Sequence, residues 1–163
     1  MRYVLVVVLA LVGFATAHAQ ESGPDHGNGI VVKDGITTID PPTVRRPGGY
    51  ALGKMVPMDA NILFTAGQVG VDLDGNYGET LEEQADLAMK NLYEVIKAAG
   101  MGPENVLKMT MFYLNVEDIS VIWAARQRVF GDDFRPGSTA LVVKSLAGPH
   151  LLVEVEAIAA KVD

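Results

Sequence analysis

The chain has 163 residues, of which 49% are hydrophobic and 20% are charged, and its formal net charge is −7. This composition is typical of a single globular domain. The acidic excess argues against binding to nucleic acid or to an anionic membrane surface, because both partners require clustered Lys and Arg. The sequence has no cysteine, which excludes disulfides, thiolate nucleophiles and cysteine-ligated metals.

The first residues have the pattern of a secretory signal peptide. Arg2 is a short positive start, Val4 to Phe14 is an apolar stretch, and Ala17-His18-Ala19 is a small-x-small cleavage signal. The apolar stretch is shorter than the roughly 20 residues that cross a bilayer. We therefore expect residues 1–19 to be removed and residues 20–35 to form a flexible arm. The mature protein is then periplasmic or secreted, with no attachment to a membrane.

Three strands are predicted in the first part of the domain. Ile36 to Asp40 forms a short strand that ends at two prolines. Tyr50 to Met58 and Ile62 to Val71 are apolar runs separated by Asp59-Ala60-Asn61. This arrangement predicts two strands joined by a hairpin turn.

The strongest helix signal extends from Glu79 to Ala99. Apolar residues recur there at spacings of three and four, Thr80 and Glu83 have the spacing of a capping box, and Gly100 supplies a C-terminal stop. This pattern predicts an amphipathic helix with one stripe packed on a sheet.

A strand and a second helix are predicted to follow. The strand extends from Asn105 to Leu114, and the helix from about Val116 to Phe130. Trp123, the only tryptophan, is on the apolar stripe of this helix. Its position alone does not decide between the core and an interface.

The last two predicted strands are Thr139 to Lys144 and Leu151 to Ala160, interpreted as buried strands joined by a turn at Gly148-Pro149. In the second strand, Glu154 and Glu156 alternate with aliphatic side chains. One face is therefore core and the other is acidic. An acidic face is either solvated or lines a pocket where a carboxylate holds a water as a general base. The pattern leaves both interpretations open.

The predicted order is strand, strand, strand, helix, strand, helix, strand, strand. Strands mixed with two amphipathic helices predict an α+β two-layer sandwich with both helices on one face of the sheet. The sequence has no glycine-rich phosphate loop or nucleophile elbow, and no histidine and carboxylate cluster at the spacing of metal ligands. No metal site is predicted.

Several short motifs follow one another along the chain. They are Ile62 to Val69 (ILFTAGQV), Gln84 with Ala88 and Asn91-Leu92, Ala98 to Gly100, Val106 to Lys108, and Val153 to Ala159 (VEVEAIA). In order and spacing they resemble the Rid family, the reactive-intermediate deaminases also called the YjgF family. The resemblance covers about residues 36–161, so we expect residues 36–163 to form one Rid-like domain.

The resemblance implies a chorismate-mutase-like α+β subunit (βββαβαββ, with a mixed sheet) that assembles as a homotrimer with small-molecule pockets between subunits. Active members hydrolyse a 2-imino or 2-enamino acid to the 2-keto acid and ammonia without a metal or an organic cofactor. The resemblance also implies that Glu154 positions the attacking water and that Tyr50 lines the pocket.

One position departs from the family pattern. Active members carry an arginine two residues after a proline, where it binds the substrate carboxylate, and the matching residue here is Ser138, after Pro136. Ser138 and Thr139 are expected to bind substrate, whereas Arg135 would reach the pocket only through a rerouted loop. Because a hydroxyl does not replace a charge-assisted hydrogen-bonded pair, the departure argues against 2-imino acids as substrates.

Two functions therefore stay open. The first is an enzyme that hydrolyses imines or enamines, with Glu154 as the catalytic residue. The second is an exported trimer that binds a small ligand without chemistry. The glutamate and the pocket tyrosine favour the enzyme, whereas the missing arginine on an intact fold favours the binding protein.

Overall fold

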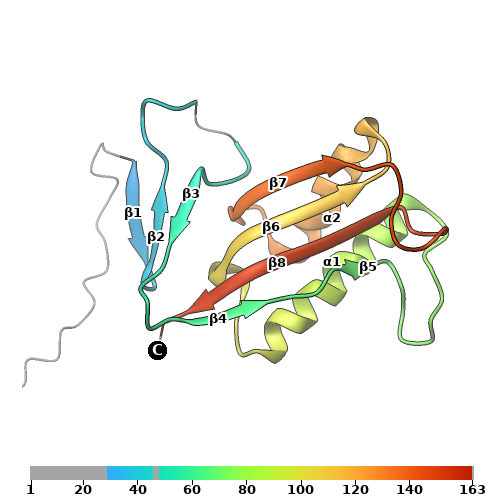
Figure 1. Ribbon diagram of the computed structural model, residues 1–163, viewed down its shortest axis with the longest axis horizontal. Coiled ribbons are helices and arrows are strands. Elements are labelled where there is room, and N and C mark those ends of the chain that lie inside the picture. The colour runs from blue at the N-terminus through green and yellow to red at the C-terminus, as the bar shows by residue number, and fades with distance from the viewer. Residues whose placement is uncertain (1–28, 46–47, 163) are drawn as a thin grey trace, which may run out of the picture.

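The computed structural model describes residues 29–45 and 48–162 (Figure 1). The predicted signal peptide, residues 1–19, lies outside the described residues, so export stays a prediction. Figure 1 shows two helices against one side of a mixed sheet, with a second, three-stranded sheet at one end of the molecule. Within the described ranges, neither helix has the length and the hydropathy needed to cross a bilayer.

The main sheet has five strands, and β8 is its central strand. β8 (Val153–Lys161) pairs antiparallel with β4 (Asn61–Phe64), with β5 (Gln68–Val69) and with β6 (Val106–Tyr113). β7 (Gly137–Val142) pairs parallel with β6 at the edge. The mixed sheet and the α+β class agree with the prediction.

Both predicted helices are present, as α1 (Leu81–Ala98) and α2 (Ile119–Phe130). The hydroxyl of Thr80 accepts a hydrogen bond from the amide of Glu83, and the Glu83 carboxylate accepts one from the amide of Thr80, each at 3.2 Å. The predicted capping box is confirmed. Two short 3-10 turns, η1 (Pro103–Asn105) and η2 (Val116–Asp118), precede β6 and α2.

The two faces of β8 differ as its sequence predicts. Val153 and Val155 are completely buried, whereas Glu154 and Glu156 point to the other side and are half-buried. The buried face packs on α1 and α2 and forms the core. Its largest completely buried side chains include Met89, Leu92, Ile96, Met109, Met111 and Ile122.

A second sheet precedes the main one and begins earlier than predicted. β1 (Ile30–Lys33), β2 (Ile36–Ile39) and β3 (Gly53–Met55) are antiparallel neighbours in that order. The prediction of a flexible arm to residue 35 is wrong for β1, because β1 pairs with β2 across a turn at Asp34-Gly35. Both turn residues have positive φ, which a two-residue hairpin turn requires.

Two predicted strand pairs are also wrong. β3 does not form a hairpin with β4; it pairs with β2, and the apolar run from Ile62 to Val71 divides into β4 and β5. β7 and β8 are not neighbours, because β6 lies between them. β7 is an edge strand whose last three residues are exposed, so it is not buried. β3 thus pairs with the strand before it, and β7 pairs with the strand that precedes α2.

Gln84 links α1 to the connection that leads into β8. It is 2% exposed, and its side-chain amide donates to the carbonyls of Gly78 and His150, at 3.0 and 2.8 Å. Its oxygen accepts from the amide of Leu152 at 2.9 Å. The side chain thus satisfies three backbone groups that would otherwise lack partners.

We expect Gln84→Met to lower the free energy of unfolding by at least about 2 kcal/mol, because each backbone group left unsatisfied costs about 1–3 kcal/mol. Methionine matches glutamine in length and helix propensity, so packing changes little. Urea denaturation measures the difference. Lys90→Met, on the exposed side of the same helix, is the control, and equal stability of the two variants would contradict the role of Gln84.

Candidate functional site

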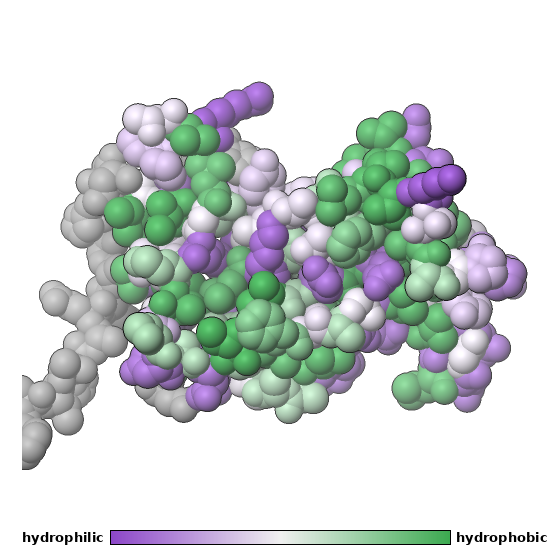
Figure 2. All heavy atoms as spheres, viewed as in Figure 1, coloured by the Kyte–Doolittle hydropathy of each residue, from purple (hydrophilic) through white to green (hydrophobic). Residues whose placement is uncertain are grey.

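The side of the main sheet that faces away from α1 and α2, called the open face below, carries polar and charged side chains. Cross-strand partners share a face of a sheet. Glu156 of β8 pairs with Thr110 of β6, which in turn pairs with Thr139 of β7. Glu154 pairs with Phe112, and so lies on the same face. In Figure 2, hydrophobic residues (green) lie beside hydrophilic residues (purple) on the side of the molecule that is shown.

The carboxylate of Glu154 lies directly against the backbone of Gly67. A Cβ atom at residue 67 would lie 1.9 Å from Oε1 of Glu154, so a side chain there would displace the carboxylate. Two hydrogen bonds between Thr65 and Ala157 hold this segment on β8, one between backbone groups at 3.0 Å and one from the Ala157 amide to the Thr65 hydroxyl at 2.9 Å. The TAGQ motif thus forms one wall beside Glu154.

The structure places Ser138 and Thr139 on opposite faces of β7. Ser138 pairs with Met109, whose side chain is completely buried in the core. The Ser138 hydroxyl is itself buried and has no hydrogen-bond partner among the described residues. Thr139 lies on the open face with Glu154. Of these two predicted substrate-binding residues, only Thr139 therefore shares the face of the predicted catalytic residue.

Lys108 supplies a cation on the open face that the sequence analysis did not assign to the site. It pairs with Gly137 of β7 and with Ile158 of β8, and its amine donates a hydrogen bond to the hydroxyl of Thr139. Along β6, Lys108, Thr110 and Phe112 alternate with two buried methionines. This alternation could have placed Lys108 on the open face. The sequence analysis used Lys108 only as part of a family motif.

Arg135 is directed toward the N-terminal sheet. Its guanidinium donates to the carbonyl of Tyr50 at 2.9 Å and lies 3.9 Å from the carboxylate of Asp40. Asp40 is buried on β2's C-terminal side, and its other oxygen accepts from the amide of Leu52 at 2.7 Å. Arg135 thus holds the backbone of the predicted pocket tyrosine, while its own charge is paired with Asp40.

The loop that contains Tyr50 rests on α2. Arg126 is 2% exposed, and it donates to the carbonyl of Gly49 at 3.1 Å. Its guanidinium stacks 3.8 Å above the ring of Trp123, and Gly49 lies so close to that ring that a Cβ would be 2.6 Å from it. Burial lowers the pKa of Arg126 to about 10, which leaves it charged at neutral pH. Trp123 therefore packs under the Tyr50 loop.

Among residues 29–45 and 48–162, no three histidine or carboxylate side chains cluster closely enough to hold a metal ion.

A family model described as Endoribonuclease L-PSP matches residues 51–161. A Lactococcus lactis protein named AldR is 33% identical over 126 residues, which cover 76% of this chain and 94% of the relative. The human 2-iminobutanoate/2-iminopropanoate deaminase is 27% identical over 119 residues, which cover 72% and 85%.

Solved structures share the fold. YyfB of Yersinia pestis, described as a protein of the conserved Rid family, has a TM-score of 0.66 and 29% identity, and the match covers 77% of this chain and 98% of YyfB. Escherichia coli TdcF with bound serine has a TM-score of 0.58 and 27% identity, with 72% and 91% covered.

We expect Gly67→Ala to move the Glu154 carboxylate while leaving the fold intact, because the new methyl group meets the end of a flexible side chain. The melting temperature should fall by no more than a few degrees, and a crystal structure should show the carboxylate rotated away. Gly48→Ala, whose Cβ meets no atom within 4 Å, is the control. A Gly67→Ala structure with Glu154 unmoved would refute the close contact.

Proposed function

The chain belongs to the Rid (YjgF/RidA) family, and from this we propose that it hydrolyses a small reactive imine or enamine to a carbonyl compound and ammonia. Two observations support the proposal. The Glu154 carboxylate lies on the open face against a wall of backbone, and the family's curated relatives include a 2-iminobutanoate/2-iminopropanoate deaminase. The first of these carries the proposal.

The chemistry requires a base at Glu154. The carboxylate accepts a proton from a bound water while the water oxygen adds to the imine carbon, and the imine nitrogen takes up a proton. The resulting carbinolamine loses ammonia as its hydroxyl proton leaves, and the carbonyl forms. Atoms balance as imine plus water giving carbonyl plus ammonia, and the step needs no oxidant or reductant.

We assign Lys108 the role of binding the carboxylate of a substrate that carries one. Ser138 provides no charge, and Arg135 is paired with Asp40. Lysine is a point charge on a flexible stem, whereas arginine binds a carboxylate through a planar fork. A substrate held by Lys108 would therefore be bound less tightly than by the arginine of the family pattern, and uncharged imines become competitive substrates.

A binding protein without chemistry is the second candidate, and the serine at position 138 favours it.

An RNA substrate, which the name of the family model suggests, is disfavoured by the net charge of −7.

Three subunits are proposed to complete the site. The open face exposes Ile62 to 49%, Phe64 to 71% and Leu141 to 42%, beside the charged groups of the site. Apolar side chains gathered on one face of a sheet are typical of a surface that a partner covers. A homotrimer in which the open faces meet would cover these side chains and enclose Glu154 between subunits.

Glu154→Gln tests the enzyme. With 2-imino acids generated by an amino-acid oxidase, the natural protein should reduce capture of the imine by semicarbazide, and Glu154→Gln should lose at least about 100-fold of this activity, as expected for a missing general base. Glu156→Gln, on the same face of the same strand, is the matched control. An inactive natural protein that still binds imine analogues would favour the binding candidate.

Lys108→Met tests the assignment of the carboxylate. We expect KM for a 2-imino acid to rise about tenfold, equivalent to about 1.4 kcal/mol, with little change for an imine that has no carboxylate. Steady-state kinetics with both substrates makes the comparison. Equal effects on the two substrates would show that Lys108 does not bind the carboxylate.

Phe64→Asp tests the assembly. The natural protein should have about three times the mass of one chain by light scattering, and Phe64→Asp should shift the mass toward the monomer, because a charge in an apolar interface is costly. Leu73→Asp, at an exposed turn position, should leave the mass unchanged. A monomeric natural protein at micromolar concentration would overturn the trimer.

A further inference from the structure

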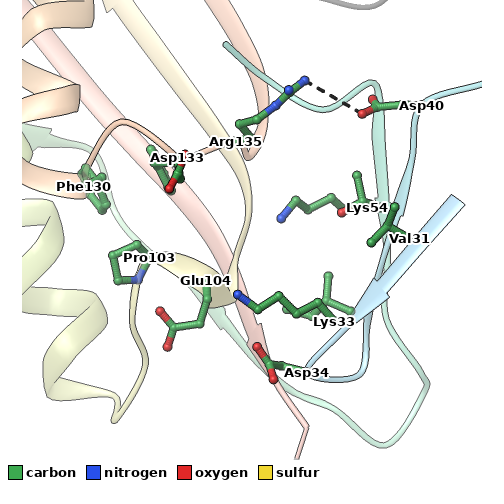
Figure 3. A pocket seen from close by; sticks show the side chains of 13 residues that line it. Val31, Lys33, Asp34, Asp40, Lys54, Pro103, Glu104, Phe130, Asp133 and Arg135 are labelled. Carbon is green, nitrogen blue, oxygen red and sulfur yellow. Dashed lines mark ion pairs between the residues drawn. The ribbon is translucent and has the colours of Figure 1, made fainter. Parts of the chain in front are cut away.

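A cavity of about 420 Å³ lies between the N-terminal sheet and the end of α2, away from Glu154 (Figure 3). β1, β2 and β3 form one wall, and η1 with the end of α2 and the loop after it forms the other. None of the residues that line it belongs to the open face of the main sheet. The cavity is therefore a second concave region, separate from the site proposed above.

The lining combines an apolar wall with both signs of charge. Ile36, Phe130 and Phe134 provide apolar surface. The charged groups that face the cavity are Lys33 and Asp34 from β1 and its turn, Asp40 from the end of β2, Lys54 from β3, Glu104 from η1, and Asp133 and Arg135 from the loop after α2. Figure 3 shows the Lys54 side chain reaching from β3 into the space between the two walls.

Lys54 differs from an ordinary surface lysine. It is half-buried, and its burial lowers its pKa below the usual value; the charge of Lys33 lowers it further, while Asp40 opposes the shift. A lysine desolvated beside another cation has more of its amine in the neutral, nucleophilic form at a given pH. The cavity thus contains an amine suited to attack an electrophile.

The surrounding groups decide among ligand classes. A simple anion is disfavoured, because four carboxylates line the cavity together with its three cations. A metal cation is disfavoured by those three cations. An amine beside carboxylates matches the requirements of imine formation, in which one group adds to a carbonyl and others move protons. The apolar wall accommodates the carbon skeleton of a small organic molecule.

We propose that this cavity binds a small carbonyl compound and that Lys54 joins it as a Schiff base. The Lys54 nitrogen adds to the carbonyl carbon, so that a carbon–nitrogen bond forms and the oxygen takes up one of the two protons of the neutral amine. A lining carboxylate removes a proton from nitrogen and returns it to the hydroxyl group, which leaves as water. The products are one imine and one water molecule, and the reaction is reversible.

The test uses the protein without its predicted signal peptide, and the probe is butanal, an uncharged aldehyde whose carbon chain suits the apolar wall. Sodium cyanoborohydride is the added reductant that converts any Schiff base into a stable secondary amine. Peptide mapping by mass spectrometry then reports labelling of every lysine in the natural protein. We expect Lys54 to be labelled several-fold faster than the exposed Lys90 and Lys97, and to keep its reactivity at a lower pH than they do.

Two variants complete the experiment. Lys54→Arg keeps the charge but forms no Schiff base, so the fast labelling should disappear while the melting temperature stays similar. Lys33→Arg is the matched control in the same cavity and should keep it. Equal labelling of all lysines in the natural protein, or fast labelling at Lys33 instead, would overturn the proposal. This outcome is read from the natural protein alone, so it does not depend on whether the variants fold. Imine hydrolysis at Glu154 is measured separately, so failure of one proposal leaves the other intact.

Discussion

The alternation of side chains along β8 is the constraint on which both the core and the site depend. This strand is hydrogen-bonded on both sides, to β4 and β5 at one edge and to β6 at the other. Val153 and Val155 fill the core, so Glu154 between them must face outward. A slip of one residue would bury both glutamates and expose the valines. The hydrophobic effect that builds the core therefore also positions the carboxylate.

The second constraint is the junction between the two sheets, where the loop at residues 49–51 is held in place. Arg126 and Arg135 both donate to carbonyls of the loop at residues 49 and 50, and the next residue, Ala51, forms a bridge with the first residue of β7. The tyrosine loop is thus fixed by two arginine side chains and by this single bridge to β7. Arg135 belongs to this junction twice, because it holds the Tyr50 backbone and also lines the cavity that contains Lys54.

Local patterns predicted much of the fold, and the errors concern which strand pairs with which. α1 carries its own periodicity and capping box, and the period of two along β8 reveals which side is core. The wrong hairpin between β3 and β4 arose because a short strand does not encode its partner. Arg135 could not be placed from sequence, since its position depends on Asp40, 95 residues away. The residues that line the cavity of Lys54 come from segments far apart in the domain, so no local sequence pattern predicted the cavity.

Because Trp123 packs at this junction, its intrinsic fluorescence can be used to observe the junction. It is the only tryptophan in the chain, and its ring contacts both the Arg126 guanidinium and Gly49. An indole beside a cation and a backbone segment responds to small movements of either. Intrinsic fluorescence of this protein therefore reports on one place, the seat of the tyrosine loop, without any introduced label.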